Sequence, residues 1–267
     1  MPSEKPITRV GLARALSKLG YCSRSQAAEL IRAGRVRLNG QVRRDPETPV
    51  RLAADRISVS GDAVDSAPKI YLMMNKPRGL VTTASDEKGR DTVYSIIEKS
   101  SESLPWLAPV GRLDKASEGL LLLTNDSEWA ARITDPATHL DKTYHVQIKA
   151  GFSDEMLKVL RKGVGDEGEL FRAKAVTLVR SGEKNCWLEI VLDEGRNRHI
   201  RRMMDALGIE VLRLIRIAIG PLMLGNLAKG TVRALSREEK LLLDRTMLNS
   251  DFPGQSRRAR RENVRND

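Results

Sequence analysis

The feature that most restricts the fold is a run of four leucines, Leu120–Leu123, that follows a polar loop. A short continuous apolar run bounded by turn residues is typical of a strand that is buried on both faces. The loop before it begins at Gly111, ends at Gly119 and carries Asp114. Because such a loop presents its side chains from the end of a rigid sheet, binding and catalytic groups are often placed there. We therefore expect a sheet-based domain with Asp114 held at the mouth of the sheet.

Strand patterns dominate the chain after Ser66, at Ile70–Met74, Leu120–Leu123, Tyr144–Ile148, Ala173–Val179, Trp187–Leu192 and Val211–Ile219. Helical patterns lie between some of these strands and after them, and include Asp154–Arg161 and Ser236–Leu248. The last helix begins with the capping-box spacing, Ser236 followed three residues later by Glu239. Strands mixed with helices in this order predict an α+β fold.

The first sixty-six residues follow a different pattern. Two short helices are expected at Arg9–Leu19 and Ser25–Ala33, and a small hairpin after them turns at Asn39-Gly40. The segment that follows lacks hydrophobic periodicity and contains Pro68, so we place a domain boundary near Ser66. The chain is thus divided into a small domain over 1–66, a larger domain over 67–250 and a basic tail over 251–267, which we expect to be disordered until it meets RNA.

Positive charge is concentrated at the two ends of the chain. The protein has 46 Lys and Arg against 35 Asp and Glu, a formal net charge of +11 and a pI near 9.9. Residues 1–66 carry +5 of that excess and residues 253–267 carry +3. Four arginines line the expected hairpin, where one face could follow phosphates: Arg35, Arg37, Arg43 and Arg44. An ordinary solvated edge is the alternative, but the balance of charge favours a nucleic-acid partner.

Several other classes of protein are disfavoured. Cys22 and Cys186 are the only cysteines, they are far apart, and only three histidines are present, so neither a disulfide framework nor a metal site is expected. The first residues, Met1–Lys5, are polar, and no apolar run approaches the roughly 18 residues of a membrane span. We expect a protein of the reducing cytoplasm without a membrane segment.

Asp114 lies close to Arg112, and an Asp beside an Arg is more often a structural ion pair than a catalytic group. The wider sequence decides between these interpretations. The run Gly111-Arg112-Leu113-Asp114 followed by a leucine-rich strand resembles the signature of pseudouridine synthases, with Ser117 where that family usually has Thr. Two further segments resemble the same family in the same order: Lys142-Thr143-Tyr144, and the arginine-rich run from Glu194 to Met204 with His199 in place of a common Gln.

The resemblance implies a role for each matching residue. Asp114 would be the catalytic carboxylate, Arg201 the arginine that pairs with it, and Tyr144 the active-site tyrosine. Supporting or RNA-binding roles would fall to Arg112, Lys142, Arg196, Arg198 and Arg202. A helix starting near Asn197 would place its arginines away from an apolar face, and for Arg196 and Arg202 we prefer a solvated or RNA-contacting role.

The N-terminal segment from Arg9 to Gln41 resembles the alpha-L RNA-binding module of a ribosomal small-subunit protein, and Asn75–Gly79 matches the opening strand of the synthase domain. The whole resemblance spans roughly Arg9 to Leu243. It implies a catalytic domain with a mixed, largely antiparallel sheet flanked by helices. It also implies isomerisation of a uridine in ribosomal RNA without a small-molecule cofactor or metal. We expect a monomer.

Two alternatives remain open at this point. A non-catalytic RNA-binding or ribosome-assembly protein would have the same basic ends, and an RNA glycosidase would use paired carboxylates and release free base. A phosphate-binding GxxxxGK[ST] loop and the H-x-E and PCxxC ligands of a zinc deaminase are both absent from the sequence.

Overall fold

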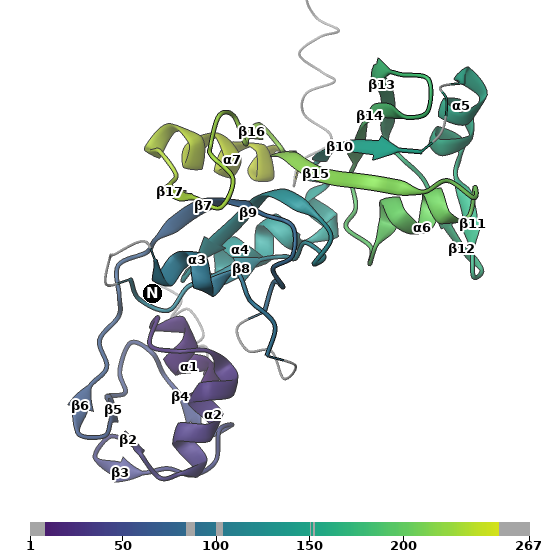
Figure 1. Cartoon of the computed structure of the whole chain (residues 1–267). Helices are drawn as coiled ribbons and strands as arrows, with labels where there is room; N and C mark the ends of the chain where they lie inside the picture. Colours follow the sequence, from purple (N-terminus) through teal and green to yellow (C-terminus); the bar gives the residue numbers. More distant parts are fainter. Residues whose placement is uncertain (1–8, 84–88, 100–103, 150, 152, 251–267) are drawn as a thin grey trace, which may run out of the picture. The chain divides into compact units, whose positions relative to one another are not determined.

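The computed structural model of the protein describes residues 9–83, 89–99, 104–149, 151 and 153–250. These residues form two compact units (Figure 1). The first unit contains the chain up to Tyr71 together with residues 104–108 and Leu123–Ser127, and the second contains the rest. The predicted basic tail, 251–267, lies outside the described residues, and the predicted boundary near Ser66 stays a prediction.

The first unit combines two helices with short strands. The helices are α1 (Leu12–Lys18) and α2 (Arg24–Arg32). One small sheet has the strand order β3 (Gln41–Val42), β2 (Val36–Leu38), β5 (Ile57–Val59) and β6 (Asp62–Ala63), and a second pairs β1 (Val10–Gly11) with β4 (Pro49–Val50). The predicted helix from Arg9 starts later, at Leu12, because the residues before it pair as a strand.

Local sequence signals explain this unit. Ser23 caps α2, where its hydroxyl accepts a hydrogen bond from the Gln26 amide at 3.2 Å and its own amide donates to the Gln26 side chain at 3.0 Å. The hairpin turns at Asn39 (φ 52°) and Gly40 (φ 80°), the pair of positive φ angles that an Asn-Gly hairpin turn requires. Apolar side chains of both helices and of β2 and β5 are buried together, among them Leu12, Leu16, Ile31, Val36 and Val59.

A nine-stranded sheet forms the framework of the second unit. Its strand order is β13 (Ala175–Ser181), β14 (Cys186–Leu192), β10 (Lys142–Ile148), β15 (Val211–Ile219), β9 (Glu118–Thr124), β7 (Tyr71–Lys76) and β17 (Val232–Ala234), with β16 (Leu222–Met223) on β15 and β8 (Ala108–Val110) on β9. Five of the pairings run antiparallel, and β9 with β15 runs parallel. The α+β prediction with a mixed, largely antiparallel sheet is therefore confirmed.

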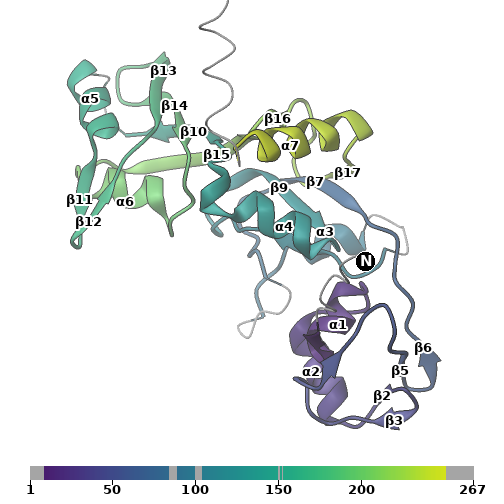
Figure 2. The same ribbon diagram turned by 180° about the vertical axis from the view of Figure 1, so that it is seen from behind.

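Helices cover the sheet at several places. They are α3 (Tyr94–Glu98), α4 (Ser127–Thr134), α5 (Asp154–Lys162), α6 (His199–Asp205) and α7 (Arg237–Ser250), with a short 3-10 turn η1 (Pro136–Thr138) and a hairpin of β11 (Val164–Asp166) and β12 (Glu169–Phe171). Both views place α4 and α7 on opposite sides of the β7–β9 part of the sheet (Figures 1 and 2). None of these helices in the described chain is long and apolar enough to cross a bilayer.

The four leucines behave as the sequence predicts. All of Leu120–Leu123 is fully buried in β9. Immediately before them, Gly119 (φ 102°) lies against the backbone of Arg216 on β15, where an added Cβ would come within 2.2 Å of the Arg216 carbonyl oxygen. Only glycine permits the two strands to approach this closely. The predicted capping box of the last helix is also present, since the Ser236 amide donates to Glu239 at 2.8 Å and the Glu239 amide donates to Ser236 at 3.2 Å.

Candidate active site

A cavity of about 460 Å³ lies against the sheet of the second unit. Its walls come from the loop that carries Asp114, from the neighbouring strands β10 and β15, and from the segment that leads into α6. Six of the residues predicted from the sequence line it: Arg112, Asp114, Lys142, Tyr144, Arg196 and Arg198. The fold thus brings the three separate sequence segments to one place.

The Asp114 loop is fixed from below by a buried lysine, Lys76. Its ammonium group donates to the carbonyl oxygens of Pro77 (3.1 Å), Asp114 (3.2 Å) and Ser117 (2.9 Å). Burial lowers the pKa of Lys76 to about 8, although the charges of Asp114 and Glu118 act in the opposite direction. We did not predict this role for Lys76 from the sequence, where Asn75–Gly79 was recognised only as matching the opening strand of the synthase domain. The signal that could have identified it is a lysine at the end of an apolar strand.

Arg201 of α6 reaches the same loop, but through the backbone. Its Nη2 donates to the carbonyl oxygen of Ala116 at 3.2 Å, and its Nε is buried without a hydrogen-bond partner among the described residues. Burial lowers the pKa of Arg201 and the charge of Asp114 raises it. No ion pair within 4.0 Å joins the two side chains in the described chain, so the pairing that the resemblance implies stays a prediction.

The floor of the cavity is formed by neighbouring strands. Tyr144 of β10 lies directly opposite Arg216 of β15 in the antiparallel ladder, so both side chains point to the same face of the sheet. Lys142 is two residues before Tyr144 and also lines the cavity. Sequence reasoning identified Lys142 and Tyr144 but missed Arg216, which stood within an alternating strand pattern and gave no separate signal.

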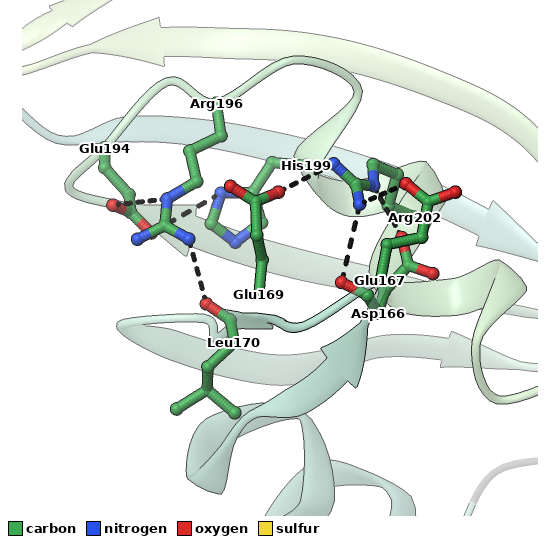
Figure 3. A network of polar contacts seen from close by, with 8 residues as sticks. All are labelled: Asp166, Glu167, Glu169, Leu170, Glu194, Arg196, His199 and Arg202. Carbon is green, nitrogen blue, oxygen red and sulfur yellow. Dashed lines mark hydrogen bonds and ion pairs between the residues drawn. The ribbon is translucent and has the colours of Figure 1, made fainter.

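Arg202, in contrast, faces away from the cavity and joins α6 to the β11–β12 hairpin. Its guanidinium contacts three carboxylates: Asp166 at 2.5 Å, Glu167 at 3.1 Å and Glu169 at 2.8 Å (Figure 3). It also lies over the ring of Phe171, 4.4 Å from the centroid. Because its charge is already balanced, this geometry favours a structural role for Arg202 over the RNA contact that we preferred from the sequence.

Arg196 is partly engaged in the same way. It pairs with Glu194 at 3.1 Å and donates to the carbonyl oxygen of Leu170 at 3.1 Å (Figure 3). Arg198 is exposed, has φ 50° and precedes α6, so the helix starts at His199 and not near Asn197. Arg198 remains the better candidate of the two for RNA contact.

His199, the residue that replaces a common Gln, is buried beneath this segment. Its Nε2 lies 3.1 Å from the carbonyl oxygen of Arg172, and its ring packs edge-on against Phe171 at 5.1 Å between centroids. Burial lowers the pKa of His199, and the neighbouring Glu194 acts against that shift. The side chain therefore supports the loop above it as a polar but mainly uncharged group.

In the first unit, the predicted arginines of the hairpin carry no carboxylate partners among the described residues. Arg35 donates to Ser60 at 3.0 Å, Arg37 to the carbonyl oxygen of Gly40 at 3.0 Å, and Arg43 to Gln41 at 2.8 Å. Arg44 donates to the carbonyl oxygen of Arg32 at 3.0 Å. Because these neutral partners leave the positive charges unbalanced, the hairpin suits a polyanion.

Comparison with known proteins decides the family. The family model described as RNA pseudouridylate synthase matches residues 70–206. The chain belongs to the RNA pseudouridylate synthase family. A second model, the S4 domain, matches residues 10–57, which confirms the RNA-binding module expected at the N-terminus.

Individual relatives agree with this assignment. The chain is 36% identical to ribosomal large subunit pseudouridine synthase B of Bacillus subtilis, over 85% of this chain and 93% of the relative. It is 38% identical to an uncharacterised RNA pseudouridine synthase of Aquifex aeolicus, over 86% and 92%. A solved pseudouridylate synthase structure is similar with a TM-score of 0.59 and 30% identity, over 88% of this chain and 99% of that one. The protein is thus an enzyme that isomerises uridine in RNA, and the non-catalytic and glycosidase alternatives are set aside.

The residues of this pseudouridylate synthase fit their reaction chemically. The bond from the sugar carbon C1′ to N1 of uracil must break, the detached base must turn, and a bond from C1′ to C5 must form. Nothing is oxidised and nothing is lost. A carboxylate, an aromatic ring and several cations around one cavity supply what such a reaction requires. In the described part of the chain, no cluster of three or more candidate metal ligands is present.

Proposed function

We propose that the enzyme isomerises a uridine of ribosomal RNA and that Asp114 is its catalytic carboxylate. The single observation that carries the assignment of Asp114 is its position. It lines the cavity, together with Tyr144, from a loop that Lys76 holds by the carbonyl oxygens of Asp114 and Ser117. Asp114 would act either by attacking C1′ or by removing a sugar proton, and both routes need the ionised carboxylate. Arg201 places a positive charge near that carboxylate.

Tyr144 is proposed to stack on the uracil, and its hydroxyl could help to remove the proton from C5 after the new bond forms. Because the target base must leave its helix or loop to reach Asp114, cationic side chains around the cavity would hold the neighbouring backbone. Arg112, Arg196 and Arg198 line the cavity and are exposed, which suits such contacts.

Ribosomal RNA is proposed as the substrate on two grounds. The Bacillus subtilis relative is named for the large ribosomal subunit. The S4 domain of this chain carries the unbalanced arginines of the hairpin, which would bind a structured RNA through its phosphates. We further propose that the enzyme is a monomer of the cytoplasm. It would need no cofactor, because the reaction has no net redox change and loses no group.

The test is to map pseudouridines on the ribosomal RNA of cells that lack this protein and of the same cells complemented with it. The proposal predicts that at least one pseudouridine disappears in the deletion strain and returns on complementation. The Asp114→Asn variant should not restore it. An unchanged ribosomal RNA map, with a lost pseudouridine in another RNA, would contradict the proposed substrate while leaving the enzyme class intact.

A further inference from the structure

Arg216 is a buried cation with a free donor at the floor of the cavity. Only 6% of the residue is exposed. Its Nε donates to the carbonyl oxygen of Leu120 at 2.7 Å, which fixes the guanidinium against β9. Its Nη2 is buried and has no hydrogen-bond partner among the described residues. An unpaired buried N–H group of this kind is unfavourable, so the position suits a ligand that supplies an acceptor.

A second cation lies on the same floor. Lys142 lines the cavity, and its side chain makes no hydrogen bond or ion pair with any residue in the described part of the chain. Burial lowers the pKa of Lys142 and the charge of Arg216 lowers it further, whereas the charges of Asp141 and Asp193 act in the opposite direction. Glu194 also lines the cavity, but it is already paired with Arg196. The floor therefore holds two positive charges with room for an electron-rich group beside them.

The depth of this site indicates which part of an RNA could reach it. Backbone phosphates stay at the outside of a folded RNA, whereas an extruded base enters furthest into the enzyme. Uracil carries two carbonyl oxygens, and both become more negative when the C1′–N1 bond breaks, because the bonding electron pair stays with the base. Donors that are already in place where such charge develops stabilise the transition state more than the ground state.

We propose that Arg216 is a further catalytic residue, whose free Nη2 donates to a carbonyl oxygen of the extruded uracil and stabilises its negative charge as the glycosidic bond breaks. Lys142 adds a second positive charge nearby. This proposal rests on the proposed function of Asp114 in the same cavity. Arg216 only donates a hydrogen bond and does not transfer its proton. An electron pair of C5 later forms the C1′–C5 bond, and the proton that C5 loses is balanced by the proton that N1 gains.

The test compares two RNAs that carry uridine or 5-fluorouridine at the mapped target position. Fluorine withdraws electrons and stabilises the departing base without help from the enzyme. Single-turnover loss of the target nucleoside is measured for the wild type, Arg216→Met and Lys142→Met. With uridine, Arg216→Met should be about 100- to 1000-fold slower than the wild type, as when one oxyanion donor is removed. With 5-fluorouridine, the same variant should be only about tenfold slower than the wild type, or less. Its defect should thus be at least about ten times smaller than its defect with uridine.

Arg213→Met is the matched control, because Arg213 lies on the same strand but pairs with the buried Glu118 at 3.1 Å, and neither residue lines the cavity. Its defect should be the same with both bases. An equal defect with both bases for Arg216→Met would overturn the proposal, and a flatter salt dependence would then assign Arg216 to a phosphate. If Arg216→Met does not fold, Lys142→Met decides by the same comparison. A wild type that converts neither base would instead contradict the proposed function.

Discussion

Lys76 holds Asp114 by its backbone and not by a side-chain ion pair: the Lys76 ammonium group donates to the carbonyl oxygen of Asp114 at 3.2 Å. The same ammonium group also holds Ser117, three residues further along the loop. Both ends of the turn that carries the carboxylate are therefore attached to one buried side chain. This arrangement fixes where Asp114 points while its carboxylate remains available at the cavity.

The lowered pKa of Lys76 gives a prediction about stability and pH. Its pKa falls from 10.5 to about 8 in the folded protein. Below pH 8 the lysine is charged in both the folded and the unfolded state, so the cost of burying the charge is fully present. Between pH 8 and 10.5 only the unfolded state keeps the proton, so the free energy of unfolding should rise with pH, by at most about 3 kcal/mol.

Lys76→Met should lack this rise. Denaturant unfolding at several pH values from 7 to 10.5 measures it, with Lys149→Met, a substitution of an exposed surface lysine, for comparison. The gap between wild type and Lys76→Met should widen in favour of the wild type as pH increases. Parallel curves for these two proteins would show that the buried lysine does not titrate in this range.

Two substitutions of Tyr144 distinguish stacking of its ring on the base from proton transfer by its hydroxyl. Tyr144→Phe keeps the ring and loses the hydroxyl, whereas Tyr144→Leu loses both. If stacking dominates, Phe should retain measurable turnover, and Leu should lose a further factor of about 5 to 150, the value of about 1–3 kcal/mol for stacking one base. Single-turnover rates on the target RNA measure both. Complete loss in both variants would make the hydroxyl essential.

The hairpin arginines are expected to bind RNA phosphates. Replacing Arg35, Arg37 and Arg43 by Gln should weaken RNA binding and reduce the log–log salt slope by about 0.7 for each lost contact, or about 2 in total. Filter binding at four or more salt concentrations gives the slope. Arg51→Gln is the control, because Arg51 is paired with Asp55 at 3.1 Å in the same unit. A triple variant with the wild-type slope would argue against an RNA-binding hairpin.

Two arginines in one segment should behave differently. Arg202 is balanced by three carboxylates, so Arg202→Met should lower the melting temperature and leave the salt slope of RNA binding unchanged. Arg198 is exposed at the cavity, so Arg198→Met should reduce the slope by about 0.7 and leave the melting temperature unchanged. Thermal unfolding and RNA titration of both variants test the contrast, and the reverse result would restore the RNA-contacting role for Arg202.

Much of the fold could be predicted because its signals are local. The Leu120–Leu123 strand, the Asn39-Gly40 turn and the Ser236–Glu239 capping box depend on residues that are neighbours in the chain. The short hairpin at Val164–Phe171 was missed, because its strands have three residues each and too few apolar positions to show a period.

The site was predictable only in part for the same reason. A glycine-bounded loop before a buried strand singled out Asp114, and resemblance added Tyr144 and Arg201. Arg202 looked like a free cation, because its carboxylate partners lie more than thirty residues away, on the hairpin that the sequence did not reveal. Arg216 could not be recognised, since its role depends on which strand lies beside it.

The central claim is tested most directly by Asp114→Asn. This change keeps the size of the side chain and removes its negative charge, and no ion pair of Asp114 within 4.0 Å is lost in the described chain. One preparation should be assayed for pseudouridine formation on ribosomal RNA, RNA affinity and thermal unfolding. We predict that pseudouridine formation falls to background while affinity and melting temperature stay close to the wild type. Pseudouridine formation at the wild-type rate would contradict the account.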